Sequence, residues 1–271
     1  MSESSSDKRK AYKDADFLDS YDARALRILA EYLEPEARFK RLGVTDTIVF
    51  FGSARLRPRD RAEAELAAAR ETGVDVPAAE THLRMSRYYE DARELARRLS
   101  EWSRELDGHE GRFVVCTGGG PGAMEAANRG AAEAGALNVG LSISIPVEEF
   151  QNRYLTPELA FEFHYFFMRK FWFTYLAKAV IVMPGGFGTM DETFELMTLI
   201  QTLKMKKRLP VVLFGETFWN EVINMDALVK HGTVNAKDLE LFHRTDSVDD
   251  AFDFVTRELV AHALNGAGPS L

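Results

Sequence analysis

The chain of 271 residues has very little cysteine, since Cys116 is the only one. One cysteine excludes an internal disulfide bond and any metal site built from cysteines alone, and it suits a reducing compartment. The six histidines show no metal-ligand spacing such as H-x-x-x-H, so the sequence predicts no metal site. Cys116 itself lies in an apolar stretch, where a thiol is expected to be a small buried hydrophobic group.

Long hydrophobic runs and an excess of basic charge are also missing. No segment approaches the roughly 18–20 consecutive apolar residues of a membrane span, and the polar N-terminus lacks the apolar core of a signal peptide. A net charge of -8 disfavours non-specific binding to nucleic acids. We therefore expect a soluble cytoplasmic protein with no membrane or nucleic-acid partner. Residues 1–14 have few apolar side chains and are predicted to be a disordered tail.

Short apolar runs alternate with helical patterns along the rest of the chain. Strands are predicted at residues 47–51, 113–116, 139–145, 180–183 and 211–214, with an edge strand at 239–242 and a β-prone aromatic stretch at 161–167. Helices are predicted at residues 17–39 (ended or kinked by Pro35), at 58–106 as two helices broken at 72–77, and at 123–134, 171–178, 218–231 and 248–264.

This alternation predicts the α/β class, with a Rossmann-like, doubly wound, mostly parallel sheet, helices on both faces and an added N-terminal helix. Residues 15–265 are expected to form a single domain, in which residues 58–106 are a helical insertion.

Residues 180–195, VIVMPGGFGTMDETFE, are the most informative stretch of the sequence. An apolar run, a glycine turn and a helix that Thr189 is expected to open make the strand–loop–helix unit that binds phosphate in α/β proteins. Gly185, Gly186 and Gly188 have no Cβ, so their backbone N–H groups can approach an anion closely. The positive end of the helix and the Thr189 hydroxyl would add to the attraction.

The first glycine loop along the chain, TGGGPGA at residues 117–123, formally satisfies the dinucleotide fingerprint G-x-G-x-x-A. The acidic residue that should end the next strand is missing, so binding of a dinucleotide such as NAD is disfavoured. Neither loop has the Walker form of nucleotide triphosphatases. Two glycine loops in one sheet instead predict a mononucleotide or sugar phosphate, with the alternative that Gly118, Gly119 and Gly120 only make a tight turn.

Several segments in order resemble the LOG ("lonely guy") family, the cytokinin riboside 5′-monophosphate phosphoribohydrolases. PGGFGTMDE is similar to the family motif PGGxGTxxE, and Arg169-Lys170 stands where the family has an Arg-Lys pair. TGGG resembles the family's SGGG-type loop, FGSAR at 51–55 its GS turn, and IPVE at 145–148 with Asn152 its LPxE…N segment. The resemblance covers residues 45–215, and the extra helices suggest a larger bacterial-type member. Many relatives are labelled lysine decarboxylases, but no pattern here points to pyridoxal phosphate, and no cofactor is expected.

The resemblance implies hydrolysis of the N-glycosidic bond of a nucleoside 5′-monophosphate, AMP or an N6-modified relative, to free base and ribose 5-phosphate. It implies Arg169 and Glu192 as catalytic residues. The N–H groups and the dipole of the helix end are expected to keep Glu192 ionised. The resemblance also implies phosphate or substrate contacts from the two glycine loops and from these polar residues: Ser53, Glu148, Lys170, Thr189, Asp191 and Thr198.

Some alternatives remain open at the level of the sequence. Thr189 to Glu192 is also a capping-box pattern, in which the glutamate only satisfies backbone N–H groups. Asp191 fits a first-turn acid, and Lys170 fits a solvated side chain. A broad nucleoside-5′-monophosphate nucleosidase and a non-catalytic nucleotide or cofactor carrier are the competing functions. The family assembles as dimers or larger oligomers, so we expect a homo-oligomer, with the aromatic stretch 161–175 either in the core or between subunits.

Overall fold

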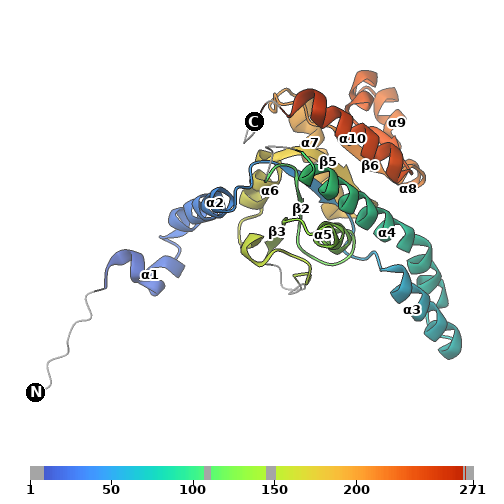
Figure 1. Ribbon diagram of the computed structural model, residues 1–271, viewed down its shortest axis with the longest axis horizontal. Coiled ribbons are helices and arrows are strands. Elements are labelled where there is room, and N and C mark those ends of the chain that lie inside the picture. Colours follow the sequence, from blue (N-terminus) through green and yellow to red (C-terminus); the bar gives the residue numbers. More distant parts are fainter. Residues whose placement is uncertain (1–8, 107–110, 145–150, 265, 267–271) are drawn as a thin grey trace, which may run out of the picture.

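The computed structural model describes residues 9–106, 111–144, 151–264 and 266. Its strands form one fully parallel sheet in the order β4-β3-β2-β1-β5-β6-β7 (Figure 1). The strands are β1 (Thr47–Phe51), β2 (Val114–Thr117), β3 (Asn138–Ile143), β4 (Ala160–Phe163), β5 (Ala177–Val182), β6 (Val211–Phe214) and β7 (His243–Thr245). The predicted Rossmann-like, doubly wound sheet is confirmed.

Helices cover both faces of this sheet. One face is packed by α4 (Val76–Arg104), α5 (Ala123–Glu133) and α10 (Val248–His262). The other is packed by α2 (Arg24–Arg41), α6 (Phe166–Tyr175) and α7 (Phe187–Gln201). The remaining helical elements are η1 (Ala11–Lys13), α1 (Ala15–Asp19), α3 (Arg59–Thr72), η2 (Pro157–Leu159), α8 (Glu216–Val222), α9 (Met225–Lys230) and η3 (Ala236–Leu241).

The central strand β1 shows why the sequence folds this way. Every residue of β1 is buried, as expected for a parallel strand with helices on both faces. Because side chains alternate along a strand, Ile48 and Phe50 pack toward α4 while Val49 and Phe51 pack toward α6. Phe51 meets Phe173 of α6 edge to face, with ring centroids 5.1 Å apart.

The order of the strands places a topological switch point between β1 and β5. From β1 the chain moves outward to β4, and then returns to the other side of β1 to continue with β5, β6 and β7. Ligands of open parallel sheets bind where the strand order reverses, beyond the carboxyl ends of the strands. The loops after β1 and β5 meet there, since the Ser53 N–H donates to the Pro184 carbonyl at 3.0 Å.

The N-terminal helix continues through Pro35 to Arg41. The prediction that Pro35 ends this helix is therefore wrong. A proline inside a helix leaves the carbonyl four residues earlier without its usual donor. Here that carbonyl belongs to Glu31, and the indole N–H of Trp172 in α6 donates to it at 3.0 Å. Packing against α6 therefore replaces the missing backbone bond.

Three other predicted elements need correction. The aromatic stretch leaves the sheet after Phe163, and Phe166 and Phe167 belong to α6, which also contains Arg169 and Lys170. Residues 218–231 are two helices, because Asn224 caps α9 by accepting from the Ala227 N–H. Residues 236–241 form the 3-10 helix η3 rather than an edge strand, and the edge strand is β7.

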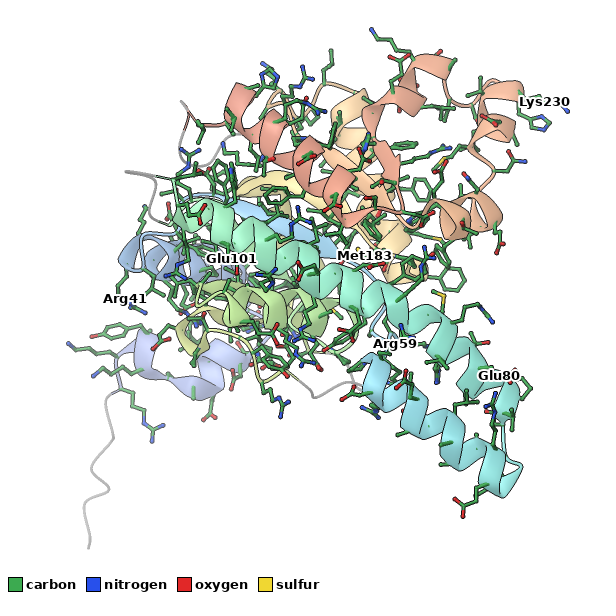
Figure 2. All side chains as sticks on the ribbon, turned by 45° about the vertical axis from the view of Figure 1, so that its right-hand side comes forward. Arg41, Arg59, Glu80, Glu101, Met183 and Lys230 are labelled. Atoms are coloured by element: carbon green, nitrogen blue, oxygen red, sulfur yellow. The ribbon has the colours of Figure 1, made fainter. Side chains whose placement is uncertain are left out.

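At the N-terminus, residues 1–8 of the predicted disordered tail lie outside the described residues, and Ala11–Lys13 form η1. Residues 59–104 are the predicted pair of helices: α3 ends at Gly73, which has a φ of 70°, and α4 returns beside it. Figure 2 shows this hairpin projecting beyond the sheet, with Glu80 near its tip and Arg59 at the start of α3. Within the described part of the chain, no helix is both long and apolar enough to cross a membrane.

Candidate active site

The N-terminus of α7 is the part of the switch point that the described residues leave uncovered. The helix begins at Phe187 after the N-cap Gly186, and its first turn contains no acidic residue. The first N–H groups of a helix have no acceptor within the helix, so they are donors for an anion. A Cβ built on Gly186 or Gly188 would meet no atom of the described residues within 4 Å.

Thr189 does not open the helix, so the capping-box alternative is wrong. It is the third residue of α7, and Glu192 is the sixth, beyond reach of the free N–H groups of the first turn. Thr189 is buried against the turn before the helix. A Cβ on Gly185 would lie 2.1 Å from the Thr189 hydroxyl oxygen, so this position requires glycine.

Arg169 and Glu192 face each other from neighbouring helices. An Nη of Arg169 in α6 donates to Oε1 of Glu192 in α7 at 3.0 Å, and the two side chains are only 12% and 14% exposed. The guanidinium lies over the rings of Phe166 and Phe173, with centroids at 5.1 and 5.5 Å. Its buried Nε has no hydrogen-bond partner among the described residues. The pair thus has a guanidinium N–H left for a substrate oxygen.

Burial sets the protonation of this pair. It raises the pKa of Glu192 to about 7, and the positive charge of Arg169 only partly offsets that effect. Burial also lowers the pKa of Arg169, but a guanidinium remains charged at neutral pH. The prediction that the helix end keeps Glu192 ionised is wrong, because the helix dipole acts within the first turn and Glu192 lies beyond it. Glu192 can therefore hold or release a proton near neutral pH.

Lys170, the next residue of α6, bridges two carboxylates of α7. Its Nζ lies 2.8 Å from Asp191 and 2.7 Å from Glu195. Burial opposes its charge, but the two carboxylates outweigh burial and the pKa of Lys170 is raised. Lys170 is thus paired rather than solvated, and Asp191 is not a first-turn acid. Glu195 was missed from the sequence, although its spacing of four residues from Asp191 places both on one helix face.

The first glycine loop is filled by the protein itself. Cβ atoms on Gly118 and Gly120 would come within 2.7 and 2.8 Å of the Met124 side chain. Gly122, with a φ of 72°, lies so close to the turn after β1 that a Cβ would be 2.2 Å from the Ser53 carbonyl oxygen. The N–H of Ala123, the first residue of α5, already donates to that oxygen at 3.0 Å.

Buried amides also occupy the carbonyls of this loop. Asn152 donates from its backbone N–H to the Gly119 carbonyl at 2.8 Å, and from Nδ2 to the Gly119 and Gly120 carbonyls, both at 3.1 Å. Its Nδ2 also lies 2.9 Å from Oδ1 of the buried Asn128, which holds Thr117 as well. Asn152 and Asn128 thus fix the shape of the loop.

The structure brings most predicted site residues to one edge of the sheet. Ser53 lies beside Pro184, and its hydroxyl oxygen accepts from the Arg55 N–H at 3.1 Å. Glu148 lies outside the described residues. Thr198 is six residues beyond Glu192, about 9 Å farther along the helix at 1.5 Å per residue. It is exposed and donates to the Phe194 carbonyl at 2.8 Å, so it is not part of the Arg169–Glu192 pair.

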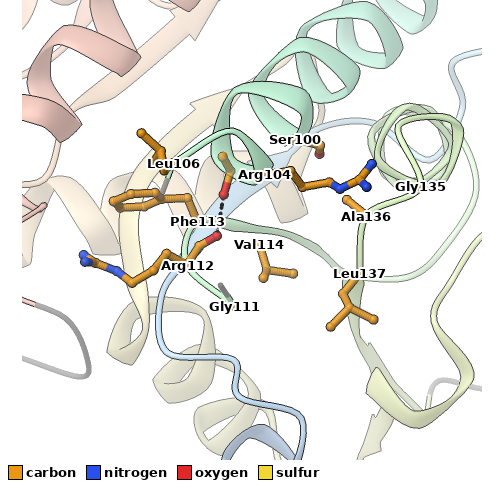
Figure 3. A pocket seen from close by; sticks show the side chains of 11 residues that line it. Ser100, Arg104, Leu106, Gly111, Arg112, Phe113, Val114, Gly135, Ala136 and Leu137 are labelled. Atoms are coloured by element: carbon orange, nitrogen blue, oxygen red, sulfur yellow. Dashed lines mark hydrogen bonds between the residues drawn. The ribbon is translucent and has the colours of Figure 1, made fainter. Parts of the chain in front are cut away.

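A cavity of about 260 Å³ lies away from this site, beside the start of β2 (Figure 3). The end of α4 and residues 135–137, which follow α5, contribute to its wall, and the Ser103 hydroxyl donates to the Arg112 carbonyl there at 2.6 Å. None of the predicted site residues that the structure describes lines it. Across the described ranges of the chain, no cluster of three or more histidine, cysteine, aspartate or glutamate side chains is placed to hold a metal ion.

The fold and the open helix end at its switch point define a Rossmann-like α/β protein with a candidate phosphate site. Residues 124–255 match the family model described as "Possible lysine decarboxylase". This match, over just under half of the chain, supports the resemblance to the LOG-type family found in its motifs. Among curated proteins, none matches the chain.

Solved structures with a similar fold include the protein TM1055, at 21% identity, 78% coverage of this chain, 99% of that chain and a TM-score of 0.47. The Moco carrier protein from Chlamydomonas reinhardtii has 19% identity, covers 80% and 99% of the two chains and gives a TM-score of 0.46. The molybdenum cofactor binding protein from the phototrophic bacterium Rippkaea orientalis has 15% identity, with coverage of 79% and 96% and a TM-score of 0.47.

Proposed function

We propose that this site hydrolyses the N-glycosidic bond of a nucleoside 5′-monophosphate, with AMP or an N6-modified AMP such as a cytokinin riboside 5′-monophosphate as substrate. We also propose that the protein acts in the cytoplasm. The observation that carries the proposed hydrolysis is the buried Arg169–Glu192 pair, 3.0 Å apart, beside an uncapped helix N-terminus. The family match over residues 124–255 supports the same chemistry.

The 5′-phosphate would bind at the N-terminus of α7. Backbone N–H groups of Phe187, Gly188 and Thr189 are available there, and the positive end of the helix dipole favours a dianion. Binding energy from the phosphate would position the sugar, since contacts remote from the reacting bond reduce the entropic cost of reaching the transition state.

The reacting carbon, C1′, would then lie near Glu192. As the bond from C1′ to the base breaks, the sugar gains oxocarbenium character, which a nearby carboxylate stabilises. Water forms the new bond to C1′ and loses its proton to Glu192, while the base leaves with the bonding electron pair and takes up a proton from solvent; Glu192 then releases its proton to solvent. Because the pKa of Glu192 is raised to about 7, its ionised form is a competent base near neutral pH.

Arg169 would orient the substrate. One Nη is used by Glu192, and the unpartnered Nε is left to donate to a ribose or phosphate oxygen. Lys170 with Asp191 forms the outer part of the same site, where Asp191 could accept from a ribose hydroxyl. A carrier would need the phosphate site alone, and a buried acid beside a buried guanidinium adds nothing to its task.

Release of free base, followed by chromatography, tests the proposal. The panel contains AMP, N6-isopentenyl-AMP, GMP, CMP, IMP and adenosine. We expect release from monophosphates and none from adenosine, with adenine nucleotides fastest. Equal rates on all monophosphates would indicate the broad nucleosidase instead. Binding without release from any of them would indicate a carrier and overturn the enzymatic proposal.

We propose further that a second copy of the chain covers the surface beside the site. Phe166 and Phe167 of α6 and Phe194 of α7 are 50%, 51% and 39% exposed around an open depression that also contains Lys170 and Glu195. Such an aromatic surface with both charge signs suits a self-complementary contact. Sedimentation of wild type and of Phe167→Glu should show a dimer or larger assembly that the variant dissociates; a monomeric wild type contradicts this.

A further inference from the structure

Helix α6, which carries Arg169, begins without a cap of its own. Its N-cap residue is Tyr165, whose side chain accepts no hydrogen bond from the helix. The acceptor comes instead from Glu31 in the N-terminal helix α2. Oε1 of Glu31 accepts from the His164 N–H at 2.7 Å, and Oε2 accepts from the Tyr165 N–H at 3.2 Å. A carboxylate in this position satisfies free donors and also interacts favourably with the helix dipole.

The backbone of the same residue holds α6 about two turns farther along. The Glu31 carbonyl, which Pro35 leaves without a helical donor, accepts from the Trp172 indole at 3.0 Å. The neighbouring Tyr32 ring packs on Phe171 and Trp172, with centroids at 5.6 and 5.8 Å. Glu31 thus contacts α6 on both sides of Arg169, through residues 164–165 and through residue 172.

Two hydrogen bonds join the Glu31 carboxylate to the backbone of Arg169. Oε2 accepts from the Tyr165 N–H, and the Tyr165 carbonyl accepts from the Arg169 N–H at 3.2 Å. The side chain of Arg169 then reaches Glu192. We propose that Glu31 is a positioning residue, which sets the start of α6 so that Arg169 meets Glu192. This inference rests on the proposed function, in which that pair acts on the substrate.

Residues 24–41 lie outside the segment that the family model matches, so the family match assigns no role to Glu31. The pair is sensitive to such positioning because it is a single hydrogen bond between two helices. A displacement of about 1 Å at a reacting group can cost on the order of 100-fold in rate. A loosened first turn of α6 would move Arg169 directly, while the open N-terminus of α7 would be unaffected.

The test compares Glu31→Ala and Glu31→Gln with the matched control Glu36→Gln. Glu36 lies on the same helix and pairs only with Lys40 among the described side chains, at 2.8 Å. Hydrolysis of AMP, its pH profile and hydrogen exchange of the amides of residues 164–169 are measured on the full chain. We expect kcat to fall about 10-fold or more in Glu31→Ala with KM within about twofold. Glu31→Gln keeps one acceptor and should recover part of the loss, and Glu36→Gln should match wild type.

The pH profile of AMP hydrolysis distinguishes a positioning role of Glu31 from a role only in stabilising α6. The groups that face Glu192 are Arg169, Lys170, Asp191 and Glu195. A displaced Arg169 stabilises the ionised carboxylate less, so the acidic limb of the profile should move to higher pH in Glu31→Ala. Faster exchange at residues 164–169 with unchanged kcat and pH profile would make Glu31 only a helix cap and overturn the inference.

Failure of the proposed function gives a different result. If wild type binds AMP but releases no adenine, affinity becomes the readout. A loss of affinity in Glu31→Ala that equals the loss in Arg169→Ala then supports the positioning role, and unchanged affinity overturns it. A wild-type chain that neither hydrolyses nor binds AMP overturns both proposals.

Discussion

The two glycine loops of this protein have nearly the same composition and position in the fold, but they differ in what surrounds them. Each follows a buried parallel strand and precedes a helix at the carboxyl edge of the sheet. Around residues 117–122, the side chain of Met124 and the backbone of Ser53 fill the space that Cβ atoms would take. Around residues 185–188, no described atom lies within 4 Å of the Cβ positions of Gly186 and Gly188.

The helices that follow repeat the contrast. The first residue of α5 donates its N–H to the Ser53 carbonyl, and Glu125 supplies an acid in the first turn. α7 has no acid in its first turn, and its first acidic side chains, Asp191 and Glu192, are used by Lys170 and Arg169. One loop therefore joins three strands tightly, and the other leaves a positive helix end free for an anion. Glycine content alone does not distinguish the two roles.

The largest expected effect is on kcat, and it distinguishes Glu192 of α7 from Glu125 of α5. Glu192→Gln should lower kcat for AMP about 1,000-fold, because the base and the charge that stabilises the cation are lost together. Glu125→Gln is the matched control, since Glu125 accepts from the buried Tyr89 hydroxyl at 2.9 Å and an amide oxygen can still accept. It should leave kcat within about twofold. Steady-state kinetics check both, and comparable losses in the two variants would remove the distinction between the loops.

The next effect concerns stability in the first loop. Gly122→Ala should destabilise the fold by about 3 kcal/mol, because it combines a positive φ with a contact to the Ser53 backbone that cannot relax as a side chain would. Gly73→Ala gives the cost of the ordinary left-handed region alone, since Gly73 has φ 70° and ψ 12° with no atom within 4 Å of its Cβ position among the described residues, whereas the ψ of Gly122 is -130° and adds to its strain. Gly73→Ala should cost about 1 kcal/mol. Chemical denaturation measures both, and equal costs would mean that the contact is unimportant.

The third effect is the pH dependence that burial gives Glu192. Its folded pKa is raised to about 7, above the unfolded value of about 4.3. Its contribution to stability is therefore complete below pH 4 and is lost as pH rises through 7. From pH 5 to pH 8 the stability of Glu192→Gln should rise relative to wild type by about 2 kcal/mol. Asp91, with a pKa raised to about 6, and Lys207, lowered to about 7, titrate in the same range but are common to both proteins. A constant difference across this range would show that Glu192 is not desolvated.

The sheet was predictable because buried parallel strands are short apolar runs, as in residues 47–51 and 211–214, and local composition identifies them. Elements whose first or last residue depends on tertiary contacts could not be predicted. Pro35 stays within a helix because Trp172 replaces the lost donor, and Phe166 leaves the sheet because Glu31 caps a new helix there. Neither partner is near in sequence.

The site divides in the same way. Arg169 and Glu192 could be singled out by motif, and Glu195 by helical spacing, because both signals are local. The raised pKa of Glu192 and the closure of the first loop by Met124 could not be predicted, because burial depends on the packing of elements far apart in the chain. Glu31 gave no signal, since a cap supplied from another helix has no fixed spacing.

The smallest expected effect tests whether the phosphate of the substrate binds in the space beside Gly188. Gly188→Ala should not destabilise the protein, because alanine favours a helix by about 1 kcal/mol over glycine and its Cβ meets no atom of the described residues within 4 Å. The methyl group would, however, occupy the space beside the free N–H groups of α7, so we expect KM for AMP to rise about 10-fold, or about 1.4 kcal/mol, with kcat little changed. Gly120→Ala is the counterpart in the first loop. Its Cβ meets only the mobile end of Met124, so KM should remain at the wild-type value. If Gly120→Ala raised KM and Gly188→Ala did not, the phosphate would bind at the first loop, and the assignment of the two loops would have to be reversed.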